Sequence, residues 1–233
     1  MKIFLIILIL STTLGYGQGQ NVVITYGLQI EKEQGLFDNN ATLKSFLEKS
    51  IVDAKKLTFQ LIITENGSKF YNEEILDSDI AINSQRFTLA MANYVGIVFS
   101  LKEKLLFQKE MLGENIYGEE ALKSNWILTN ETKLIDNYLC YKATNVFTVI
   151  NGTKVFNHPV IAWYCPQLPY PYGPAGYGNL PGLILELQVR NAVYGAKSIH
   201  LNSNLNFDIK SLEKLKILNE KQLEEAYHNV NGF

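Results

Sequence analysis

Two long runs of β-branched and aromatic residues flank the dipeptide Asn151-Gly152, and they constrain the fold more than any other feature of this sequence. The runs cover Leu134–Ile150 and Lys154–Tyr164. An Asn-Gly dipeptide between such runs is typical of a type I′ β-hairpin. We therefore expect a long antiparallel ribbon in which Asn151 and Gly152 form the turn and paired residue numbers sum to 303.

Most of the remaining chain shows the same kind of pattern, in which short apolar runs rich in Val, Ile, Tyr and Phe are bounded by turn residues. Helical segments do not separate most successive runs, so the regular crossovers of a parallel sheet are not available. We expect further strands over Val22–Ile30, Leu57–Thr64, Lys69–Ile75, Tyr94–Leu101, Lys104–Met111, Trp126–Thr129, Leu183–Arg190 and Ala192–Leu201.

Two segments have the period of a helix. In Thr42–Lys56 the apolar residues fall on one helical face, and Asn40 or Thr42 can cap its start. Near the C-terminus, the capping box Asn219–Gln222 precedes Leu223–His228. The sequence therefore predicts a mainly β (α+β) fold. We expect a single curved antiparallel sheet or half-barrel of roughly nine to ten strands with one or two helices, comparable in fold to the periplasmic lipoprotein carriers.

The composition describes one ordinary globular domain. Hydrophobic residues make up 47% of the 233 residues and charged residues 19%, which excludes a disordered chain. The formal net charge of −2 gives no basic surplus, so nucleic acid is not an expected partner. Two cysteines are too few for a disulfide-rich scaffold or for a four-cysteine zinc site.

The first twenty residues have the order of a secretory signal peptide. Met1 and Lys2 form a short basic start, Ile3–Leu10 is an unbroken apolar run, and Ser11–Gln20 is small and polar. The apolar run is too short to span a bilayer, and an uncleaved membrane anchor is the alternative. We expect residues 1–18 to be a signal peptide and residues 19–233 to be a single β-rich domain without a transmembrane span. The domain is then exported, periplasmic or secreted, and not a lipoprotein, because no cysteine lies near the cleavage site.

A segment dense in proline and glycine follows the hairpin. Residues 166–178 read PQLPYPYGPAGYG, which is incompatible with regular structure and predicts an ordered, irregular loop. The loop leads into a signature formed by Asn179, Leu180, Pro181, Gly182, Leu183 and Ile184.

This signature resembles that of the GLPGLI family, a family of exported bacterial proteins of unknown function. Matching residues continue upstream in Asn137–Thr144, in Ala162–Tyr164 and in Gly173-Pro174. The first glycine of the family signature is Asn179 here. Because asparagine tolerates positive φ better than other non-glycine residues, the turn is expected to survive. The resemblance covers most of the chain after residue 18 and implies an exported protein, but it indicates no function.

Two interpretations of this block are open. In the first, Tyr170, Tyr172 and Tyr177 of the loop share a rim with Trp163 of the hairpin, and an apolar or sugar-like ligand enters the curved sheet there. In the second, the loop folds over a sheet edge, and the signature residues have only a packing role.

The two cysteines lie in the two runs of the hairpin. With a register sum of 303, Cys140 faces Trp163 and Cys165 faces Tyr138. Both cysteines are then on one face but on a diagonal, with Cβ atoms about 7 Å apart, whereas a disulfide needs about 3.5–4.5 Å. A bulge or a longer turn would close the gap. A Cys140–Cys165 disulfide and two buried free thiols are therefore both open.

No residue pattern indicates catalysis. The histidines His158, His200 and His228 lack metal-ligand spacing, and the chain has no nucleophile elbow, phosphate-binding loop or dinucleotide fingerprint. We predict no catalytic residue, no metal and no cofactor. The expected function is a non-catalytic binding or carrier module for an apolar small molecule or lipid-like group. An accessory factor that binds an envelope protein is the alternative, and a thiol or hydrolytic enzyme is a remote one.

Overall fold

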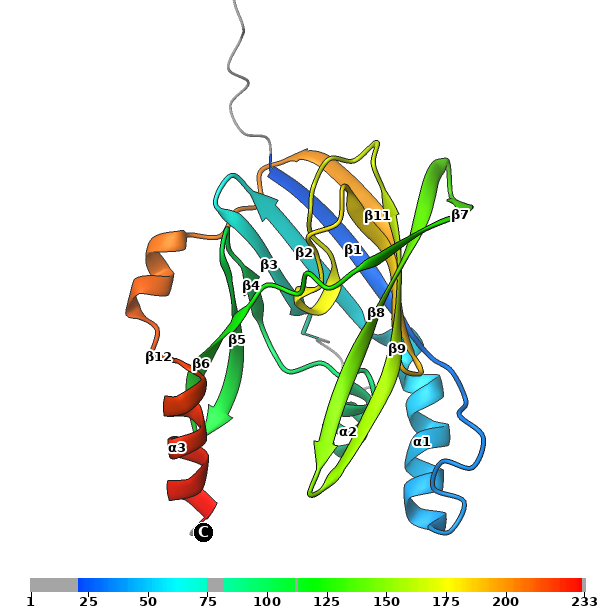
Figure 1. Cartoon of the computed structure of the whole chain (residues 1–233), viewed down its shortest axis with the longest axis vertical. Helices are drawn as coiled ribbons and strands as arrows, with labels where there is room; N and C mark the ends of the chain where they lie inside the picture. The colour runs from blue at the N-terminus through cyan, green and yellow to red at the C-terminus, as the bar shows by residue number, and fades with distance from the viewer. Residues whose placement is uncertain (1–20, 75–81, 112, 232–233) are drawn as a thin grey trace, which may run out of the picture.

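The computed structural model describes residues 21–74, 82–111 and 113–231. The predicted signal peptide lies outside these residues. Twelve strands form one sheet in the order β12-β6-β5-β4-β3-β2-β1-β11-β10-β9-β8-β7 (Figure 1). The strands are β1 (Asn21–Ile30), β2 (Thr58–Thr64), β3 (Gly67–Asn72), β4 (Val98–Ser100), β5 (Lys104–Met111), β6 (Glu114–Ala121), β7 (Ile127–Ile135), β8 (Tyr138–Asn151), β9 (Lys154–Cys165), β10 (Leu183–Val189), β11 (Ala192–Ser203) and β12 (Ile217–Leu218).

Both predicted helices are present. The helix α1 (Ala41–Asp53) is capped by Asn40, whose Oδ1 accepts a hydrogen bond from the N–H of Leu43 at 3.0 Å. The helix α3 (Glu220–Asn231) begins at the predicted capping box, in which Asn219 and Gln222 exchange side-chain to backbone hydrogen bonds. The sequence patterns did not predict α2 (Ile82–Met91) or the short 3-10 helices η1 (Ala54–Lys56), η2 (Pro174–Gly176) and η3 (Ile209–Lys214).

The predicted fold class is confirmed, with more strands than expected. The strand β6 was not predicted, and the run over Leu134–Ile150 belongs to two strands rather than one. β7 ends at Ile135 and β8 begins at Tyr138, because Asp136 turns the chain with a φ of 49°. All neighbouring strands are antiparallel except β12 and β6, which pair in parallel, so the sheet is mixed.

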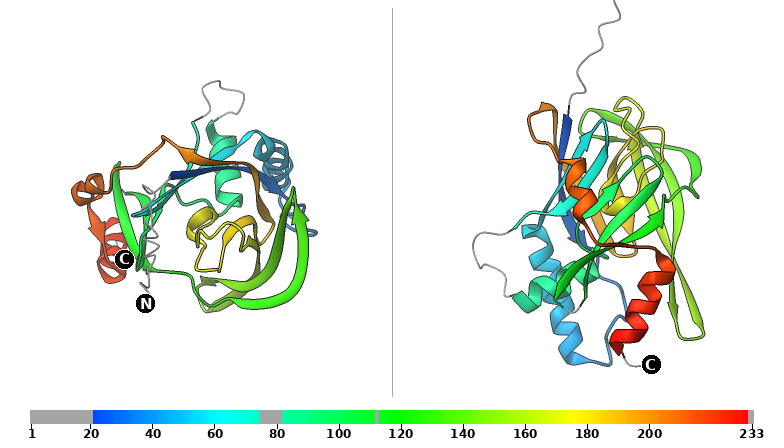
Figure 2. Two further views of the ribbon diagram at one scale, coloured as in Figure 1. Left: turned by 90° about the horizontal axis from the view of Figure 1, so that it is seen from above. Right: turned by 90° about the vertical axis from the view of Figure 1, so that its left-hand side faces the viewer.

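The sheet is strongly curved, and residues 166–182 lie inside the curve, as the view from above shows (Figure 2). Its end strands β12 and β7 are not paired with each other, so it is an open sheet. The concave face holds a cluster of fully buried aromatic rings. Phe59 stacks on Phe70 at 5.5 Å between centroids, and Tyr194 meets both rings edge-on at 5.1 and 5.8 Å. Burial of rings of this size supplies much of the stability of the fold.

The hairpin of β8 and β9 does not have the predicted register. Asn151 pairs with Lys154, so paired numbers sum to 305 and the loop is Gly152-Thr153. Gly152 has a φ of 60°, whereas Asn151 and Thr153 are not among the residues with positive φ. Positive φ at the first loop position alone, occupied by glycine, is the pattern of a type II′ turn. The predicted type I′ turn at Asn151-Gly152 is therefore wrong by one position, and this changes every residue pair of the ribbon.

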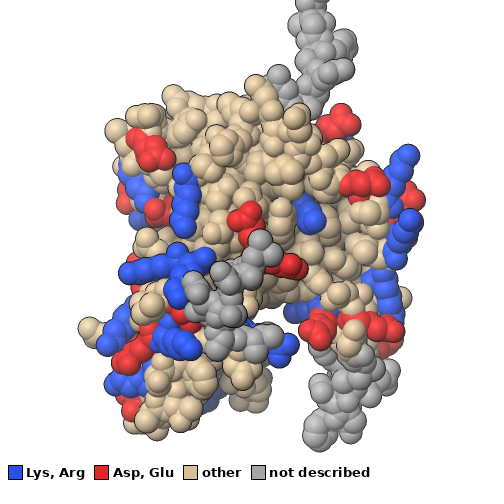
Figure 3. Space-filling view, turned by 180° about the vertical axis from the view of Figure 1, so that it is seen from behind, with Lys and Arg blue, Asp and Glu red and all other residues tan. Residues whose placement is uncertain are grey.

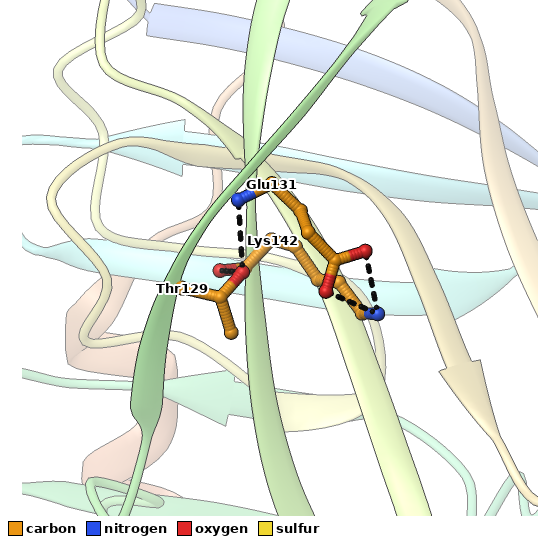
Figure 4. A network of polar contacts seen from close by, with 3 residues as sticks. All are labelled: Thr129, Glu131 and Lys142. Carbon is orange, nitrogen blue, oxygen red and sulfur yellow. Dashed lines mark hydrogen bonds and ion pairs between the residues drawn. The ribbon is translucent and has the colours of Figure 1, made fainter.

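The edge strand β7 contains a β-bulge between Leu128 and Thr132. The Thr129 hydroxyl accepts a hydrogen bond from the N–H of Glu131 and donates one to the carbonyl of Lys142, both at 3.2 Å. Lys142 Nζ contacts both carboxylate oxygens of Glu131 at 2.9 and 3.0 Å (Figure 4). These contacts tie the irregular segment of β7 to β8. A bulge at an edge also discourages pairing with a second chain.

Charged side chains of both signs are interspersed on the face shown in Figure 3, and no broad area of that face carries a single sign. Such a face offers no basic stripe for nucleic acid. Within residues 21–74, 82–111 and 113–231, no helix has the length and apolar character needed to cross a membrane.

Candidate ligand-binding cavity

A cavity of about 390 Å³ lies on the concave face of the sheet. Ligand pockets in proteins typically measure about 300–1,000 Å³, so the cavity is large enough for a small molecule. Strands β4, β5 and β6 border it on one side and β8, β10 and β11 on the other. Its main apolar side chains are Val98, Leu105, Phe107, Phe147, Val189 and Tyr194.

The alternation of side chains along β5 builds one wall. Leu105, Phe107 and Lys109 line the cavity, while Leu106 belongs to a smaller cluster on the other face of the sheet. Gly118 of β6 stands opposite Phe107, and a Cβ there would lie 2.3 Å from the Phe107 ring. Glycine at this position therefore leaves the space that the ring occupies.

The loop inside the curved sheet supplies a second wall through Tyr177. Ile184 of β10 donates its N–H to the carbonyl of Tyr172 at 3.0 Å, which ties the loop to the sheet. The indole N–H of Trp126 donates to the carbonyl of Gly178 at 2.8 Å, and the Trp126 ring meets Tyr177 edge-on at 6.0 Å. These contacts from two sides hold Tyr177 in place.

The phenols that line the cavity stay uncharged near neutral pH. Burial raises the pKa of Tyr177 to about 12, with the Glu120 carboxylate adding to the effect. Burial also raises the pKa of Tyr94 and of Tyr194. The Tyr194 hydroxyl donates to the carbonyl of Ala92 at 3.0 Å, so this polar atom is satisfied within the protein. The aromatic wall is thus apolar toward a ligand.

Four polar side chains interrupt the apolar lining. Lys123 Nζ lies 3.6 Å from the Glu120 carboxylate and 5.2 Å from the centroid of the Tyr177 ring. Lys109 Nζ lies 5.2 Å from the centroid of the Phe107 ring and has no ion pair among the described residues. The Nδ2 atom of Asn93 is buried and finds no hydrogen-bond partner within the described chain. The lining therefore offers one ion pair and one cation, while the Asn93 donor is covered by the protein itself.

The three loop tyrosines of the predicted rim have different surroundings. Tyr177 is only 7% exposed and lines the cavity. Tyr172 lines a neighbouring hollow of about 160 Å³, which shares Lys123 with the cavity. Tyr170 is partly buried against the main core and lines neither space. Of these three side chains, only Tyr177 belongs to the cavity itself.

Trp163 lines neither the cavity nor the neighbouring hollow. It pairs with Lys142 across the β8–β9 ribbon, and Lys133 Nζ lies 4.5 Å from its ring centroid. Lys133 in turn contacts Glu186 at 2.6 Å. Side chains alternate along a strand, so Trp163 points to the face opposite its neighbours Ala162 and Tyr164, which pack in the main core. Because Trp163 and Tyr170 line neither space, the four aromatic residues do not form one rim.

The signature residues connect the loop to β10 through a tight backbone crossing. Asn179 has a φ of 58°, which confirms that asparagine keeps the turn, and its N–H donates to the carbonyl of Pro171 at 2.9 Å. Gly182 has a φ of 155°, and a Cβ there would lie 2.2 Å from the carbonyl oxygen of Cys165. Of the signature, Leu180, Gly182, Leu183 and Ile184 are buried, whereas Asn179 and Pro181 are exposed.

The two cysteines are buried and carry free thiols. The observed register, extended by one residue beyond the pair Tyr141–Tyr164, places Cys140 directly opposite Cys165. This corrects the predicted diagonal arrangement. Hydrogen-bonded and non-hydrogen-bonded pairs alternate along the ribbon from the Asn151–Lys154 pair at the turn, and this alternation makes Cys140 and Cys165 a non-hydrogen-bonded pair. The Cα atoms of such a pair are about 4.5 Å apart, a separation that is compatible with a disulfide.

The Cys140 thiol does not resemble an activated nucleophile. Burial raises the pKa of Cys140 to about 12, and the neighbouring Cys165 adds to the shift. A catalytic cysteine needs the opposite shift, toward thiolate. His158 is on the same strand as Cys165 but seven residues away, or roughly 23 Å along β9. In the part of the chain that the structure describes, no three His, Cys, Asp or Glu side chains gather as metal ligands.

Comparisons with known proteins bear on the fold. The family described as a protein of unknown function (Porph_ging) matches residues 151–186, from the β8–β9 turn into β10. Two solved structures of PNGF-II, in different crystal forms, match 89% of this chain with a TM-score of 0.52 and sequence identities of 14% and 16%. The chain spans about a third, 33%, of the length of those chains. No curated protein matches the chain. At these identities the likeness concerns the fold alone.

Of the residues that line the cavity, only Tyr177 was predicted from the sequence. Phe107, Phe147 and Val189 come from three strands that are far apart in the chain, and each looks like an ordinary core residue in its own segment. Asn93 follows the unpredicted helix α2 and takes a φ of 55°. A signal for this turn was present, because asparagine is common at positive φ after a helix.

Proposed function

We propose that the protein is a non-catalytic binding or carrier module for an apolar ligand, which it holds in the cavity on the concave face. The observation that carries this proposal is the cavity itself, about 390 Å³ bounded mainly by apolar side chains. The raised pKa values of the Tyr177 phenol and the Cys140 thiol keep both groups protonated near neutral pH, so neither is an activated nucleophile. Export to the periplasm or outside the cell, and membership of the GLPGLI family, belong to the same proposal and rest on the sequence motifs.

The test is the binding of a neutral, polarity-sensitive fluorophore such as N-phenyl-1-naphthylamine. Ala90 and Val95 line the cavity yet are exposed, so both can be enlarged without disturbing the core. We expect Ala90→Trp/Val95→Trp to lower the affinity at least tenfold, because the added rings occupy the entrance. The matched control is Ala41→Trp/Val52→Trp on exposed positions of α1, which should bind as the wild type does. Equal binding by both variants would refute the cavity as the binding site.

A second function, an accessory factor that binds another envelope protein, is favoured by the outer end of the β8–β9 ribbon. Ile150 and Val155 pair across the two strands and are 72% and 60% exposed. Val146, on the same face of β8, is 57% exposed. Apolar side chains grouped in this way are typical of contact surfaces. Under this function, Ile150→Ser/Val155→Ser abolishes complex formation and leaves the binding of the fluorophore unchanged.

A further inference from the structure

We propose that Cys140 and Cys165 form a reversible disulfide in the folded protein, with the ion pair between Lys133 and Glu186 as the movable cover of the two thiols. The inference concerns oxidation of the chain itself and is independent of the ligand in the cavity. The oxidant is a small disulfide: one cysteine thiolate attacks it and releases a first small thiol, and the second cysteine then displaces the other. The two electrons and two protons that the pair loses are gained by the oxidant, which leaves as two thiols.

The first support is the position of the two thiols. The register of the ribbon, extended by one residue, places Cys140 opposite Cys165 in a non-hydrogen-bonded pair. The Cβ atoms of such pairs are near the shorter end of about 4.5–5.5 Å, and a disulfide needs about 3.5–4.5 Å. Closure of the bond therefore requires only a small approach of the two strands. Cys165 also contributes to the raised pKa of Cys140, as an adjacent thiol does.

The second support is the path of the Lys133 side chain. Lys133 pairs with Cys140 across β7 and β8, so the two side chains start beside each other on one face of the sheet. Lys133 Nζ lies 4.5 Å from the centroid of the Trp163 ring on β9 and 2.6 Å from Oε1 of Glu186 on β10. Trp163 is two residues before Cys165 and is on the same face. The Lys133 side chain thus extends from β7 across β8 and β9, over the two thiols.

The third support is the contrast in exposure between the thiols and their cover. Cys140 and Cys165 are both 0% exposed, whereas the side chains of Lys133 and Glu186 are 33% and 32% exposed. On this face, the thiols therefore lie beneath an ion pair that is in contact with water. Partly exposed ion pairs contribute little stability. The cover can open by a local movement, without separation of the strands.

Oxidation at this position would fix the base of the loop at residues 166–182. Cys165 is the last residue of β9, and its carbonyl accepts a hydrogen bond from the N–H of Leu168 at 3.1 Å. Leu183, the first residue of β10, pairs with Cys165 and donates its N–H to the carbonyl of Leu168 at 2.9 Å. Both ends of the loop thus meet at Cys165, and a covalent bond from there to β8 would hold them more firmly.

The experiment is oxidation of the reduced, folded protein by hydroxyethyl disulfide, followed by acid quenching, unfolding, alkylation with iodoacetamide and mass spectrometry. In the wild type we expect both thiols to be lost together, at a rate that does not change with urea below the unfolding transition, because only local opening is needed. Glu186→Gln should raise the rate about fivefold, the factor that corresponds to the loss of a partly exposed ion pair. It releases Lys133 and also removes a carboxylate that raises the pKa of Cys140. Hydrogen exchange of residues 166–183 should be slower in the oxidised protein than in the reduced one.

The matched control is Glu131→Gln, which also removes one carboxylate, but from the ion pair with Lys142 that joins only β7 and β8. It should react at the rate of the wild type. A rate that rises with urea in proportion to the unfolded fraction would overturn the inference, because the thiols would then react only in unfolded chains. Equal rates for Glu186→Gln and Glu131→Gln would overturn the role of the cover. A mixed disulfide that never closes would overturn the pairing, and unchanged hydrogen exchange would overturn the effect on the loop.

Discussion

Replacement of Gly182 by alanine is expected to lower the free energy of unfolding by about 2–5 kcal/mol. The added Cβ would lie 2.2 Å from the carbonyl oxygen and 2.5 Å from the carbonyl carbon of Cys165, and 2.8 Å from the nitrogen of Pro166. All three are backbone atoms, so no side chain can rotate away. Overpacking of this kind costs about 1–3 kcal/mol. The φ of 155° adds strain of about 1–2 kcal/mol for a residue with a side chain.

For a chain of this length, such a loss lowers the melting temperature by roughly 4–20 °C. Circular dichroism during thermal unfolding and urea titration would measure it. Gly152→Ala is the control, because Gly152 also has positive φ, at 60°, but a Cβ there meets no atom within 4 Å. This control isolates the strain and should cost about 1–2 kcal/mol. If Gly182→Ala is no more destabilising than Gly152→Ala, the reasoning about the backbone crossing is refuted.

Three further predictions concern the core. Tyr194→Phe should destabilise the protein by about 1–3 kcal/mol, because the carbonyl of Ala92 loses its buried partner; a urea midpoint equal to that of the wild type would contradict this. Treatment with oxidised glutathione should join Cys140 and Cys165, which are opposite in register, so that denatured protein contains no thiols reactive toward iodoacetamide; two remaining thiols would show that the pair cannot form a disulfide. The pKa values of Cys140 and Tyr177 are raised from 9.0 and 10.0 to about 12, so the folded state retains these protons at higher pH than the unfolded state. These two groups should therefore leave the free energy of unfolding unchanged below about pH 9 and lower it as the pH rises toward 12. A free energy of unfolding that stays constant over this range in urea titrations would contradict the prediction.

Local rules predicted the elements whose signals are local. Asn40 and the pair Asn219 and Gln222 cap the helices at the expected positions, because a cap depends on contacts within four residues. The β8–β9 ribbon was predicted for the same reason. Its register was not predicted, because this segment fits both a type I′ turn at Asn151-Gly152 and a type II′ turn at Gly152-Thr153. The two turns differ by one position, and the observed pairing is that of the second.

The site was less predictable than the fold. The composition of the loop indicated its aromatic side chains, but not which of them face the cavity. Trp163 was grouped with Tyr177 because the two are close in sequence, while strand alternation sends them to different faces. Phe107 and Phe147 both line the cavity only because the sheet curves, and such curvature has no signature in any single segment.

The central claim, that the cavity holds a ligand, is tested most directly by native mass spectrometry of protein purified without refolding from its natural source. We predict a bound small molecule on the wild type, released on denaturation and absent from the Ala90→Trp/Val95→Trp variant expressed in the same source. The Ala41→Trp/Val52→Trp control should retain it. The bare polypeptide mass in all three preparations, or the same adduct on the variant that blocks the entrance, would contradict the account.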